Sequence, residues 1–509
     1  MRSGPITRLL IANRGEIAVR IARACRALGI VPVAVASEAD DGALHTRVAA
    51  ETVPIGPPPA AASYLRTDRI IGAARERRCE EIHPGYGFLA QSPEFAEEVE
   101  RAGLIFVGPP AAAIRLMGDK MAARRAMAAA GVAVVPGFEG TGDEDEVLLR
   151  READRIGYPV LVKAAGGGGG RGMRVVRAPE ELGGAVESAR REALKAFGDA
   201  RLFLEKVIEE ARHVEVQVLA DARGGCLHLF ERECSIQRRF QKIVEESPSP
   251  LLDAGMREDM GQAAVAAARA CDYVNAGTIE FLVGMDRRFF FLEMNTRIQV
   301  EHPVTEMVTG VDLVRAQIRI ASGEALPVRQ EDVRQDGHAL ECRVNAEDPA
   351  RGFTPSAGGI LLASFPSGAG IRVDAGVATG DVVSPYYDSL LAKIIVHARD
   401  RQGALERMQG ALGKTAILGV ETNLSFLRTI LAHPVFRGGA ATTSFVERDL
   451  SAWRPQAAGL PDDVLIAAAL ADTLRPAPVR AALSHGTGDE ETDLFSPWGR
   501  LDGFRTGAT

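Results

Sequence analysis

A run of glycines between two apolar segments constrains this chain more than any other feature. Val160 to Ala165 is apolar apart from Lys163, residues 166–170 are all glycine, and Met173 to Val176 is again rich in β-forming residues. Apolar and β-branched residues on both sides of a segment without side chains predict a strand, a flexible loop and a second strand. Such a loop can donate backbone N–H groups to a polyphosphate, with Lys163 and Arg171 supplying positive charge. The sequence therefore predicts a nucleotide site.

Two common phosphate-binding loops fit this pattern poorly. The glycines at 167, 169 and 172 satisfy G-x-G-x-x-G, but a β-rich run follows them instead of the helix that a dinucleotide site requires. The Gly413-Lys414-Thr415 triplet lacks the earlier glycine of a P-loop, because Met408 stands there. A glycine loop on a β-hairpin, with a lysine on its entering strand, instead resembles the lid of an ATP-grasp fold.

A second pair of apolar strands predicts a metal site. Residues 278–283 and 288–295 are joined by a short turn, and pairing them would bring Glu280 near Glu293 and Asn295. Two carboxylates and an amide oxygen are hard ligands suited to Mg²⁺ (or Mn²⁺) that also binds phosphate oxygens. Unpaired charges within apolar runs are costly, which favours a metal site over a surface hairpin.

Several longer motifs make the chain resemble a known family. They are Ile11 to Ala18 (IANRGEIA), His83 to Leu89 (HPGYGFL), Arg115 to Lys120 (RLMGDK), the glycine loop, Glu293 to Thr309 with its NTRIQVEHP segment, and Glu341 to Pro349 (ECRVNAEDP). In this order they resemble biotin carboxylase, the ATP-grasp enzyme that carboxylates biotin with bicarbonate. The resemblance covers about the first 450 residues of the sequence.

The resemblance and the hydrophobic pattern together imply a multidomain α/β and α+β protein with an ATP-grasp fold. Apolar strands alternate with helical segments near the amino terminus, as in a parallel α/β layer. We expect an N-terminal α/β domain at 1–116, a linker helix and mobile lid at 117–209, and an ATP-grasp body with the biotin carboxylase C-terminal domain at 210–449. A partly disordered extension at 450–509 would contain one helix from Asp462 to Leu474.

The resemblance also implies the nucleotide contacts. Lys120 and Lys163 would contact the phosphates of ATP, and the backbone of Gly169 and Gly170 would close over them. Glu205, Lys206, Val207 and Ile208 would form the adenine-binding hinge, with His213 and Gln237 on the ribose and phosphate side. Glu280 and Glu293 would bind both ATP and the metal, together with Asn295.

Bicarbonate and biotin would meet at the NTRIQVEHP segment. The resemblance places Lys242, Arg297, Gln299 and the backbone N–H of Val300 on bicarbonate, a small anion that needs several donors. Glu301 would be the general base, and Arg343 would bind biotin and stabilise the oxyanion that develops on it. The same residues have plainer explanations: Glu301 could cap a helix, Arg343 could pair with Glu341, and His213 could be an ordinary buried histidine.

Composition excludes some other functions. A net charge of −8 argues against general nucleic-acid binding, and no window of the sequence is apolar enough to span a membrane. The amino terminus lacks a basic-then-apolar signal arrangement, and the six cysteines form no C-x-x-C pair. We expect a cytoplasmic enzyme with reduced, mostly buried thiols.

Other positions bear on partners and activity. The chain lacks Met-Lys-Met, the usual context of a biotinylated lysine, so biotin would arrive on a separate carrier protein or domain and pass its carboxyl group to a carboxyltransferase subunit. Phe240 stands where the family has a histidine near the nucleotide, which predicts altered ATP affinity. Ala27 and Ala369 replace residues of the bacterial dimer contact, which leaves homo-oligomerisation open.

The final acceptor also stays open. The residues from Ser496 to Arg505 resemble the segment that follows biotin carboxylase in acyl-CoA carboxylase alpha subunits of the acetyl, propionyl or methylcrotonyl type, although a disordered extension explains them equally well. A biotin carboxylase component of an acyl-CoA carboxylase is the first hypothesis. The alternatives are the same component of pyruvate or urea carboxylase, and an ATP-binding scaffold without turnover.

Overall fold

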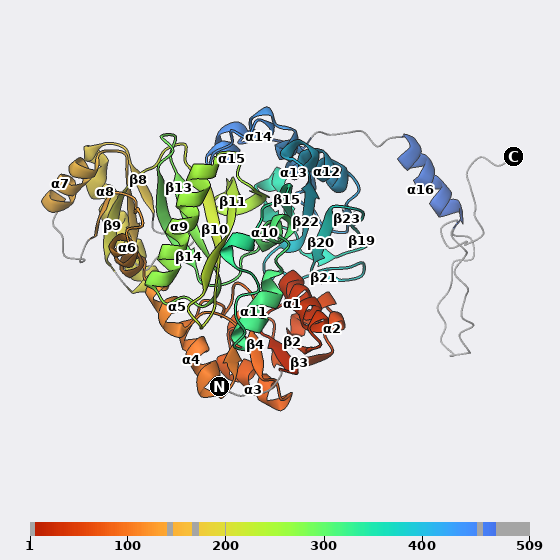
Figure 1. Ribbon diagram of the computed structural model, residues 1–509. Coiled ribbons are helices and arrows are strands. Elements are labelled where there is room, and N and C mark those ends of the chain that lie inside the picture. The colour runs from red at the N-terminus through yellow and green to blue at the C-terminus, as the bar shows by residue number, and fades with distance from the viewer. Residues whose placement is uncertain (1–5, 140–145, 165–172, 199, 456–461, 475–509) are drawn as a thin grey trace, which may run out of the picture. The chain divides into compact units, whose positions relative to one another are not determined.

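The computed structural model describes residues 6–139, 146–164, 173–198, 200–455 and 462–474 (Figure 1). The chain divides into two compact units, residues 1–454 and 455–509. The glycine loop, including Gly169 and Gly170, lies outside the described residues, as does the segment from Ser496 to Arg505. Of the second unit the structure describes α16 (Asp462–Leu474), the helix that the sequence predicts.

The first sheet of the larger unit is parallel, with the strand order β3-β2-β1-β4-β5. Its strands are β1 (Arg8–Ile11), β2 (Val31–Ser37), β3 (Glu51–Gly56), β4 (Glu81–His83) and β5 (Ile105–Phe106). The connecting helices are α1 (Gly15–Ala27), α2 (Leu44–Val48), α3 (Thr67–Glu76) and α4 (Pro93–Arg101). Apolar strand residues such as Leu9 and Leu10 are fully buried, as expected when helices cover both faces of a parallel sheet.

A four-stranded sheet carries the segment that the sequence predicts as the lid. Its order is β6-β9-β7-β8, with β6 (Gly137–Glu139), β7 (Val160–Ala164), β8 (Arg174–Val176) and β9 (Leu202–Lys206). Helices α5 (Ala111–Gly118) and α6 (Lys120–Ala129) precede this sheet in the chain. Helices α7 (Glu146–Ile156) and α8 (Leu182–Phe197) connect its strands. Strands β7 and β8 pair antiparallel, so the glycine-rich segment joins the two strands of a hairpin.

An eight-stranded sheet forms the body of the larger unit, in the order β14-β13-β10-β11-β12-β15-β22-β20. The strands are β10 (Arg212–Ala220), β11 (Cys226–Arg238), β12 (Gln241–Ser247), β13 (Asn275–Val283), β14 (Phe289–Asn295), β15 (His338–Asn345), β20 (Ile371–Ala375) and β22 (Leu390–Ala398). Every neighbouring pair in this sheet is antiparallel. The sheet therefore continues from the predicted metal strands to the ECRVNAEDP segment without interruption.

Helices and short ladders complete this unit. The helices are α9 (Ala254–Ala270), α10 (His302–Thr309), α11 (Leu313–Ala321), α12 (Arg401–Gly413), α13 (Leu424–Ala432), α14 (Pro434–Arg437) and α15 (Phe445–Asp449). Three two-stranded ladders pair β16 (Glu347–Asp348) with β17 (Thr354–Pro355), β18 (Gly358–Gly359) with β21 (Val382–Val383), and β19 (Leu362–Ser364) with β23 (Ala416–Leu418). None of the described helices is long and apolar enough to cross a bilayer.

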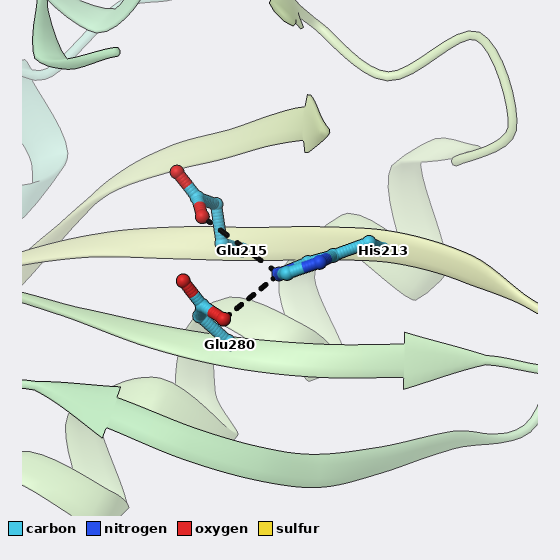
Figure 2. Close-up of side chains that lie close together, drawn as sticks. All are labelled: His213, Glu215 and Glu280. Carbon is cyan, nitrogen blue, oxygen red and sulfur yellow. Dashed lines mark ion pairs between the residues drawn. The ribbon is translucent and has the colours of Figure 1, made fainter. Parts of the chain in front are cut away.

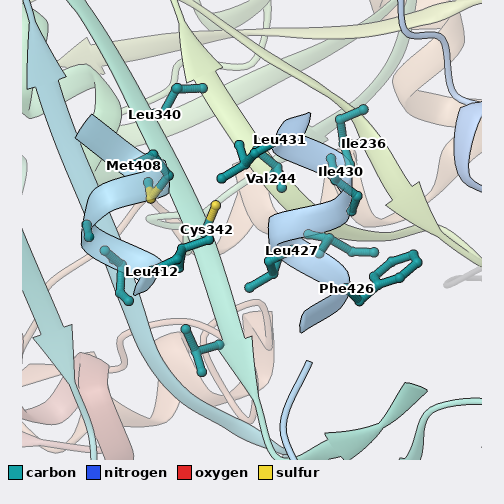
Figure 3. Close-up of a cluster of buried hydrophobic side chains, with 14 of the residues drawn as sticks. Ile236, Val244, Leu340, Cys342, Met408, Leu412, Phe426, Leu427, Ile430 and Leu431 are labelled. Carbon is teal, nitrogen blue, oxygen red and sulfur yellow. The ribbon is translucent and has the colours of Figure 1, made fainter. Parts of the chain in front are cut away.

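Hydrophobic packing fixes the large sheet against its helices. Figure 3 shows side chains of β11, β12 and β15 facing those of α12 and α13, with Cys342 and Leu427 among the buried residues. A second core packs β10, β13 and β14 against α9. Burial of apolar area on this scale is the main force that holds the sheet rigid, so polar side chains on it have fixed positions.

Candidate active site

Strand β10 places a row of polar side chains in the protein interior. His213, Glu215 and Gln217 alternate with Val214, Val216 and Val218, and successive side chains of a strand point to opposite faces. The valines pack in the core with α9, which leaves the polar row on the other face. His213 Nε2 lies 3.0 Å from Glu280 Oε2 on the neighbouring strand β13 and 4.0 Å from Glu215 Oε2 (Figure 2).

A fully buried arginine holds this face together. Arg232 on β11 donates to Glu215 Oε1 at 2.6 Å, and its guanidinium also reaches Gln299 Oε1 at 2.7 Å. Further bonds run from the same group to Gln217, Thr278 and Thr305. A buried charge is tolerated when its hydrogen bonds are satisfied, as here, and Arg232 thereby orients groups from four elements.

Lys242 is the centre of the site. Its ammonium group donates to Glu215, to Glu280 at 2.8 Å and to Glu301 at 2.7 Å. Burial opposes the charged form, but these carboxylates raise the pKa of Lys242 well above its usual range. Lys242 is therefore a permanent cation among three carboxylates at the point where β10, β12, β13 and α10 meet.

Arg343 lies beside Lys242 and shares one carboxylate with it. It donates to Glu245 at 2.6 Å and to Glu301 Oε2 at 2.8 Å. The alternative pairing of Arg343 with Glu341 is wrong: both Glu341 oxygens are buried without a hydrogen-bond partner, and burial raises the pKa of that carboxyl well above its usual range.

Glu301 does not cap its helix. It occupies the N-cap position of α10, yet its side chain accepts no capping hydrogen bond and turns to the two cations instead. Although burial favours the neutral acid, Lys242 and Arg343 hold the pKa of Glu301 well below its usual range. Glu301 is therefore an ionised proton acceptor held between the two cations.

The predicted metal ligands come together across β13 and β14. Glu280 and Glu293 are directly opposite in the strand register, and Asn295 Nδ2 donates to Glu280 Oε1 at 2.8 Å. Burial opposes ionisation of Glu280, but Lys242 and His213 hold its pKa far below its usual range. The pKa of Glu293 is raised, because the surrounding protein desolvates its carboxylate and the charge of Glu280 repels it. Glu293 still has solvent-accessible surface. A divalent cation between the two carboxylates would relieve that repulsion, so the donor set fits Mg²⁺ or Mn²⁺.

The predicted phosphate contacts face this pair from the lid side. Lys120 begins α6, and the charges of Glu293 and Lys163 both act on it; burial lowers its pKa. Lys163 on β7 forms an ion pair with Glu205 on β9, and Arg124 binds the same carboxylate at 3.0 Å. Two lysines and two carboxylates thus meet between the lid and the body.

Residues predicted for the adenine hinge differ in what their side chains do. Lys206 donates to the carbonyls of Gly157 at 2.9 Å and Tyr158 at 2.8 Å, so its side chain braces the lid. The backbone of Val207 continues beyond β9 with a bond from its N–H to Pro159, and Ile208 follows it in the loop before β10. Gln237 is buried on β11 opposite Lys242.

An open cavity of about 490 Å³ is lined in part by Arg343 and by Gln241, the residue before Lys242 on β12. Its lining includes Arg297, Val300 and Arg343, together with Arg14, Glu16, Tyr86, Phe88 and Tyr387. Arg297 reaches Gln91 Oε1 at 2.8 Å and Asn295 Oδ1 at 2.9 Å, which links the cavity lining to the metal strands. Phe240 lies in the turn between β11 and β12, is 64% exposed and has a φ of 67°. Its aromatic ring, which stands where the family has a histidine, is therefore exposed on a residue with a left-handed backbone conformation.

Sequence inspection missed three charged residues of this site. Glu215 could have been found from the strict alternation of polar and apolar residues over 213–218. Arg232 and Glu245 lie in mixed segments that carry no comparable signal, and their roles become visible only through their buried partners.

Comparisons with known proteins cover almost the whole larger unit. Residues 5–114 match the family model of the biotin carboxylase N-terminal domain, and 341–448 match that of the biotin carboxylase C-terminal domain. Residues 119–329 match the ATP-binding domain of the carbamoyl-phosphate synthase L chain.

Individual relatives extend this match. The chain is 46% identical over 502 residues to the mitochondrial methylcrotonoyl-CoA carboxylase subunit alpha of Dictyostelium discoideum, covering 98% of this chain and 70% of that protein. It is 52% identical over 443 residues to biotin carboxylase 1 of Bacillus subtilis, covering 87% of this chain and 98% of that protein.

A solved structure agrees with them. The biotin carboxylase domain of Hydrogenobacter thermophilus 2-oxoglutarate carboxylase, crystallised with MgADP, ADP and bicarbonate, superposes with a TM-score of 0.83 at 48% identity and covers 87% of this chain and 98% of that chain. Because all three family models and full-length relatives agree in order and extent, the chain belongs to the biotin carboxylase family of ATP-grasp ligases, which carboxylate biotin in an ATP-dependent reaction.

Proposed function

We propose that this chain uses Mg-ATP and bicarbonate to carboxylate biotin held on a separate carrier, through carboxyphosphate. The observation that carries the proposal is the arrangement of Lys242, Arg343 and Glu301, in which two cations flank one ionised carboxylate beside an open cavity. Lys242 offers bicarbonate a positive charge next to a proton acceptor, and Arg343 offers a second positive charge to the oxyanion that develops on biotin.

The nucleotide would lie between the lid and the body. Lys120 and Lys163 would contact its phosphates, Glu205 to Ile208 its adenine, and His213 and Gln237 its ribose and phosphate side. Glu280, Glu293 and Asn295 would hold the metal, and Asn295 also donates a hydrogen bond to Glu280. When bound, Mg²⁺ neutralises charge that develops on the transferred phosphoryl group.

Bicarbonate would bind at Lys242, Arg297, Gln299 and the N–H of Val300. A bicarbonate oxygen attacks the γ-phosphorus of ATP, the bond to ADP breaks, and carboxyphosphate forms while Glu301 takes the bicarbonate proton. Glu301 is a weak base while Lys242 and Arg343 both bind it, because the two cations hold its pKa low. Transfer of the Lys242 ammonium group from Glu301 to the bound bicarbonate raises the proton affinity of Glu301 as the bicarbonate proton is removed.

Biotin would then enter the cavity from its open side. Carboxyphosphate breaks down to CO₂ and phosphate, the phosphate takes the proton from the ureido nitrogen of biotin, and that nitrogen bonds to CO₂. Arg343 stabilises the oxygen of the deprotonated ureido ring, an anion present only during this step. Both half-reactions thus use arginines of the same cavity lining, at successive times.

The carboxyl acceptor follows from partners outside this chain. The relatives described above belong to carboxylases of methylcrotonoyl-CoA and of 2-oxoglutarate, so one kind of biotin carboxylase serves different acceptors. The alignment with the methylcrotonoyl-CoA carboxylase subunit continues past residue 454 over nearly the whole chain. This extended match favours an acyl-CoA carboxylase, with a biotin carrier and a carboxyltransferase as partners.

A single assay tests the reaction. ADP release is measured with Mg-ATP and bicarbonate, with and without free biotin. We expect turnover that requires bicarbonate and rises with biotin. ATP binding without such turnover would contradict the proposal and favour a scaffold role.

A further inference from the structure

One buried lysine joins the bicarbonate segment to α1, which also lines the cavity. Lys393 lies in the middle of β22 with its side chain fully buried, and its Nζ donates to the carbonyl of Val300 at 2.8 Å. The same Nζ lies 3.1 Å from Glu16 Oε1 and 3.9 Å from Asp374 Oδ2.

The contact with Val300 fixes the backbone that carries the proposed base. The Val300 carbonyl and the Glu301 N–H belong to one planar peptide group, so a donor on that carbonyl sets the orientation of both residues. Lys393 pairs across the sheet with Arg343, the other cation that binds Glu301. The proposed base is therefore held from its backbone by Lys393 and from its carboxylate by Arg343 and Lys242.

The contact with Glu16 reaches two further residues of the cavity lining. Glu16 lies in the first turn of α1, is buried, and accepts a hydrogen bond from the hydroxyl group of Tyr86. Both Glu16 and Tyr86 line the cavity that also holds Arg343. Tyr86 lies in the loop after β4. Lys393 therefore connects α1 and, through Glu16, the Tyr86 loop to the bicarbonate segment.

A purely structural ion pair is an insufficient account of this arrangement. Removing two charges from water is expensive, and apolar residues of similar size often stabilise a core equally well. Lys393 also donates to a neutral backbone carbonyl at the active site, and Asp374 has its own ion pair with Arg372.

We propose that Lys393 is a positioning residue that aligns the bicarbonate segment with Glu16 and Tyr86 in the cavity that biotin would enter, through its contacts with Val300 and with Glu16. The inference rests on the proposed function and deepens it, because it assigns to one residue the geometric coupling of the two half-reactions. Without that coupling, carboxyphosphate would form and decay before biotin captures its CO₂.

The test compares four full-length variants in the biotin-dependent assay, with carboxybiotin and ADP measured together. Lys393→Met should raise the KM for both bicarbonate and free biotin at least five-fold and lower the carboxybiotin formed per ADP at least three-fold. Lys393→Arg, which can still reach both partners, should recover most of each loss. Glu16→Gln should raise the KM for biotin alone, because it leaves the bond between Lys393 and Val300 in place.

Arg401→Met is the matched control. Arg401 forms buried bonds to Glu246 in the same large sheet but contacts no residue of the cavity. Its loss should lower the melting temperature to a similar extent as Lys393→Met while leaving both KM values and the carboxybiotin ratio unchanged.

The outcomes separate the inference from the proposed function. Absence of biotin-stimulated turnover in the wild-type protein overturns both. With that turnover present, a Lys393→Met protein that melts earlier but keeps its KM values and product ratio overturns the inference alone. If Lys393→Met fails to fold, Glu16→Gln decides: equal changes in the KM for bicarbonate and biotin, or no change in either, contradict it.

Discussion

At the residue scale, the site is a set of charges that already satisfy one another. Lys242 binds three carboxylates, Glu280 accepts bonds from Lys242, Asn295 and Gln299, and Glu301 binds two cations. Substrate anions must therefore displace internal partners, and each displacement changes the pKa of the group left behind. Single substitutions should alter specific steps more than they alter the fold.

Glu280→Gln tests the metal assignment. The amide keeps the shape of the side chain but removes the charge that faces Glu293, so we expect Mg-ATP turnover to fall at least ten-fold with the fold intact. Turnover as a function of Mg²⁺ concentration and a circular dichroism melt are the measurements. Glu231→Gln, which removes a buried carboxylate bound to Arg257 away from the site, is the control. Near-wild-type turnover in Glu280→Gln would refute the assignment.

Arg343→Ala tests the division between the half-reactions. The proposed oxyanion exists only on biotin, so the variant should lose biotin carboxylation by at least ten-fold more than it loses biotin-independent ATP hydrolysis. Both rates are measured on the same preparation with bicarbonate saturating. An equal loss of the two rates would instead place Arg343 on bicarbonate or in the framework.

Glu81→Gln tests a buried carboxyl outside the site. Burial raises the pKa of Glu81 to about 8, with only Ser322 donating to it. The folded protein then binds a proton that the unfolded chain releases above its ordinary pKa of about 4.5, so Glu81 lowers the free energy of unfolding as pH rises through that interval, by up to about 1.4 kcal/mol per pH unit. Glutamine removes this slope.

Urea unfolding at pH 6 and pH 8 measures the effect. The stability difference between Glu81→Gln and the wild-type protein should favour the variant more at pH 8 than at pH 6. A difference independent of pH would show that Glu81 is ionised in the folded protein.

At the element scale, the cavity depends on how closely the end of β20 approaches the start of α1. A Cβ at Gly376 would lie 2.5 Å from the Glu16 backbone nitrogen and 3.0 Å from the Gly15 carbonyl carbon. Both neighbours are backbone atoms that cannot rotate away. The position of α1, and with it the Glu16 side chain, therefore depends on the absence of a side chain at Gly376 after β20.

Gly376→Ala tests this contact between elements. The added methyl group should displace the start of α1, lower the free energy of unfolding by about 1–3 kcal/mol, and raise the KM for biotin more than that for ATP. Gly72→Ala is the control, since Gly72 lies within α3 with open space around it and alanine there should stabilise the helix by about 1 kcal/mol. Unchanged stability and KM in Gly376→Ala would show that the loop absorbs the methyl group.

At the scale of the whole molecule, the active-site residues all lie in the larger unit. The unit ends at residue 454, and biotin carboxylase 1 of Bacillus subtilis aligns over 98% of its own length with only 87% of this chain. This relative therefore corresponds over nearly its whole length to a part of the chain similar in size to the larger unit. The finer domain boundaries at 116, 209 and 449 stay a prediction.

A chain ending after Arg454 tests the independence of this unit. It should keep biotin-dependent ADP release within about two-fold of the full chain and a similar melting temperature, because the described site and its cores lie before that residue. Turnover and melting are compared for the two proteins at equal concentration. Loss of folding or of turnover would assign a stabilising role to residues 455–509.

Local patterns predicted much of this molecule. Runs of apolar residues predicted the strands β1, β2, β13 and β14, and the helix α16 was also predicted. The spacing of Glu280, Glu293 and Asn295 predicted their meeting across a hairpin. These predictions succeeded because the side-chain periods of strands and helices are local properties of the backbone. The ordered motifs predicted the family, and the comparisons confirm it.

Sequence patterns were enough to predict most elements, the family and the polar residues within its motifs. The folded chain alone reveals that Glu215, Arg232 and Glu245 join the site, and that Arg343 pairs with Glu301 and not Glu341. The same holds for Lys393, which reaches both Val300 and Glu16. These contacts join segments that are distant in the sequence. Their distances depend on strand register, the packing of α1 on the large sheet and the burial of charges, none of which is encoded in a local pattern.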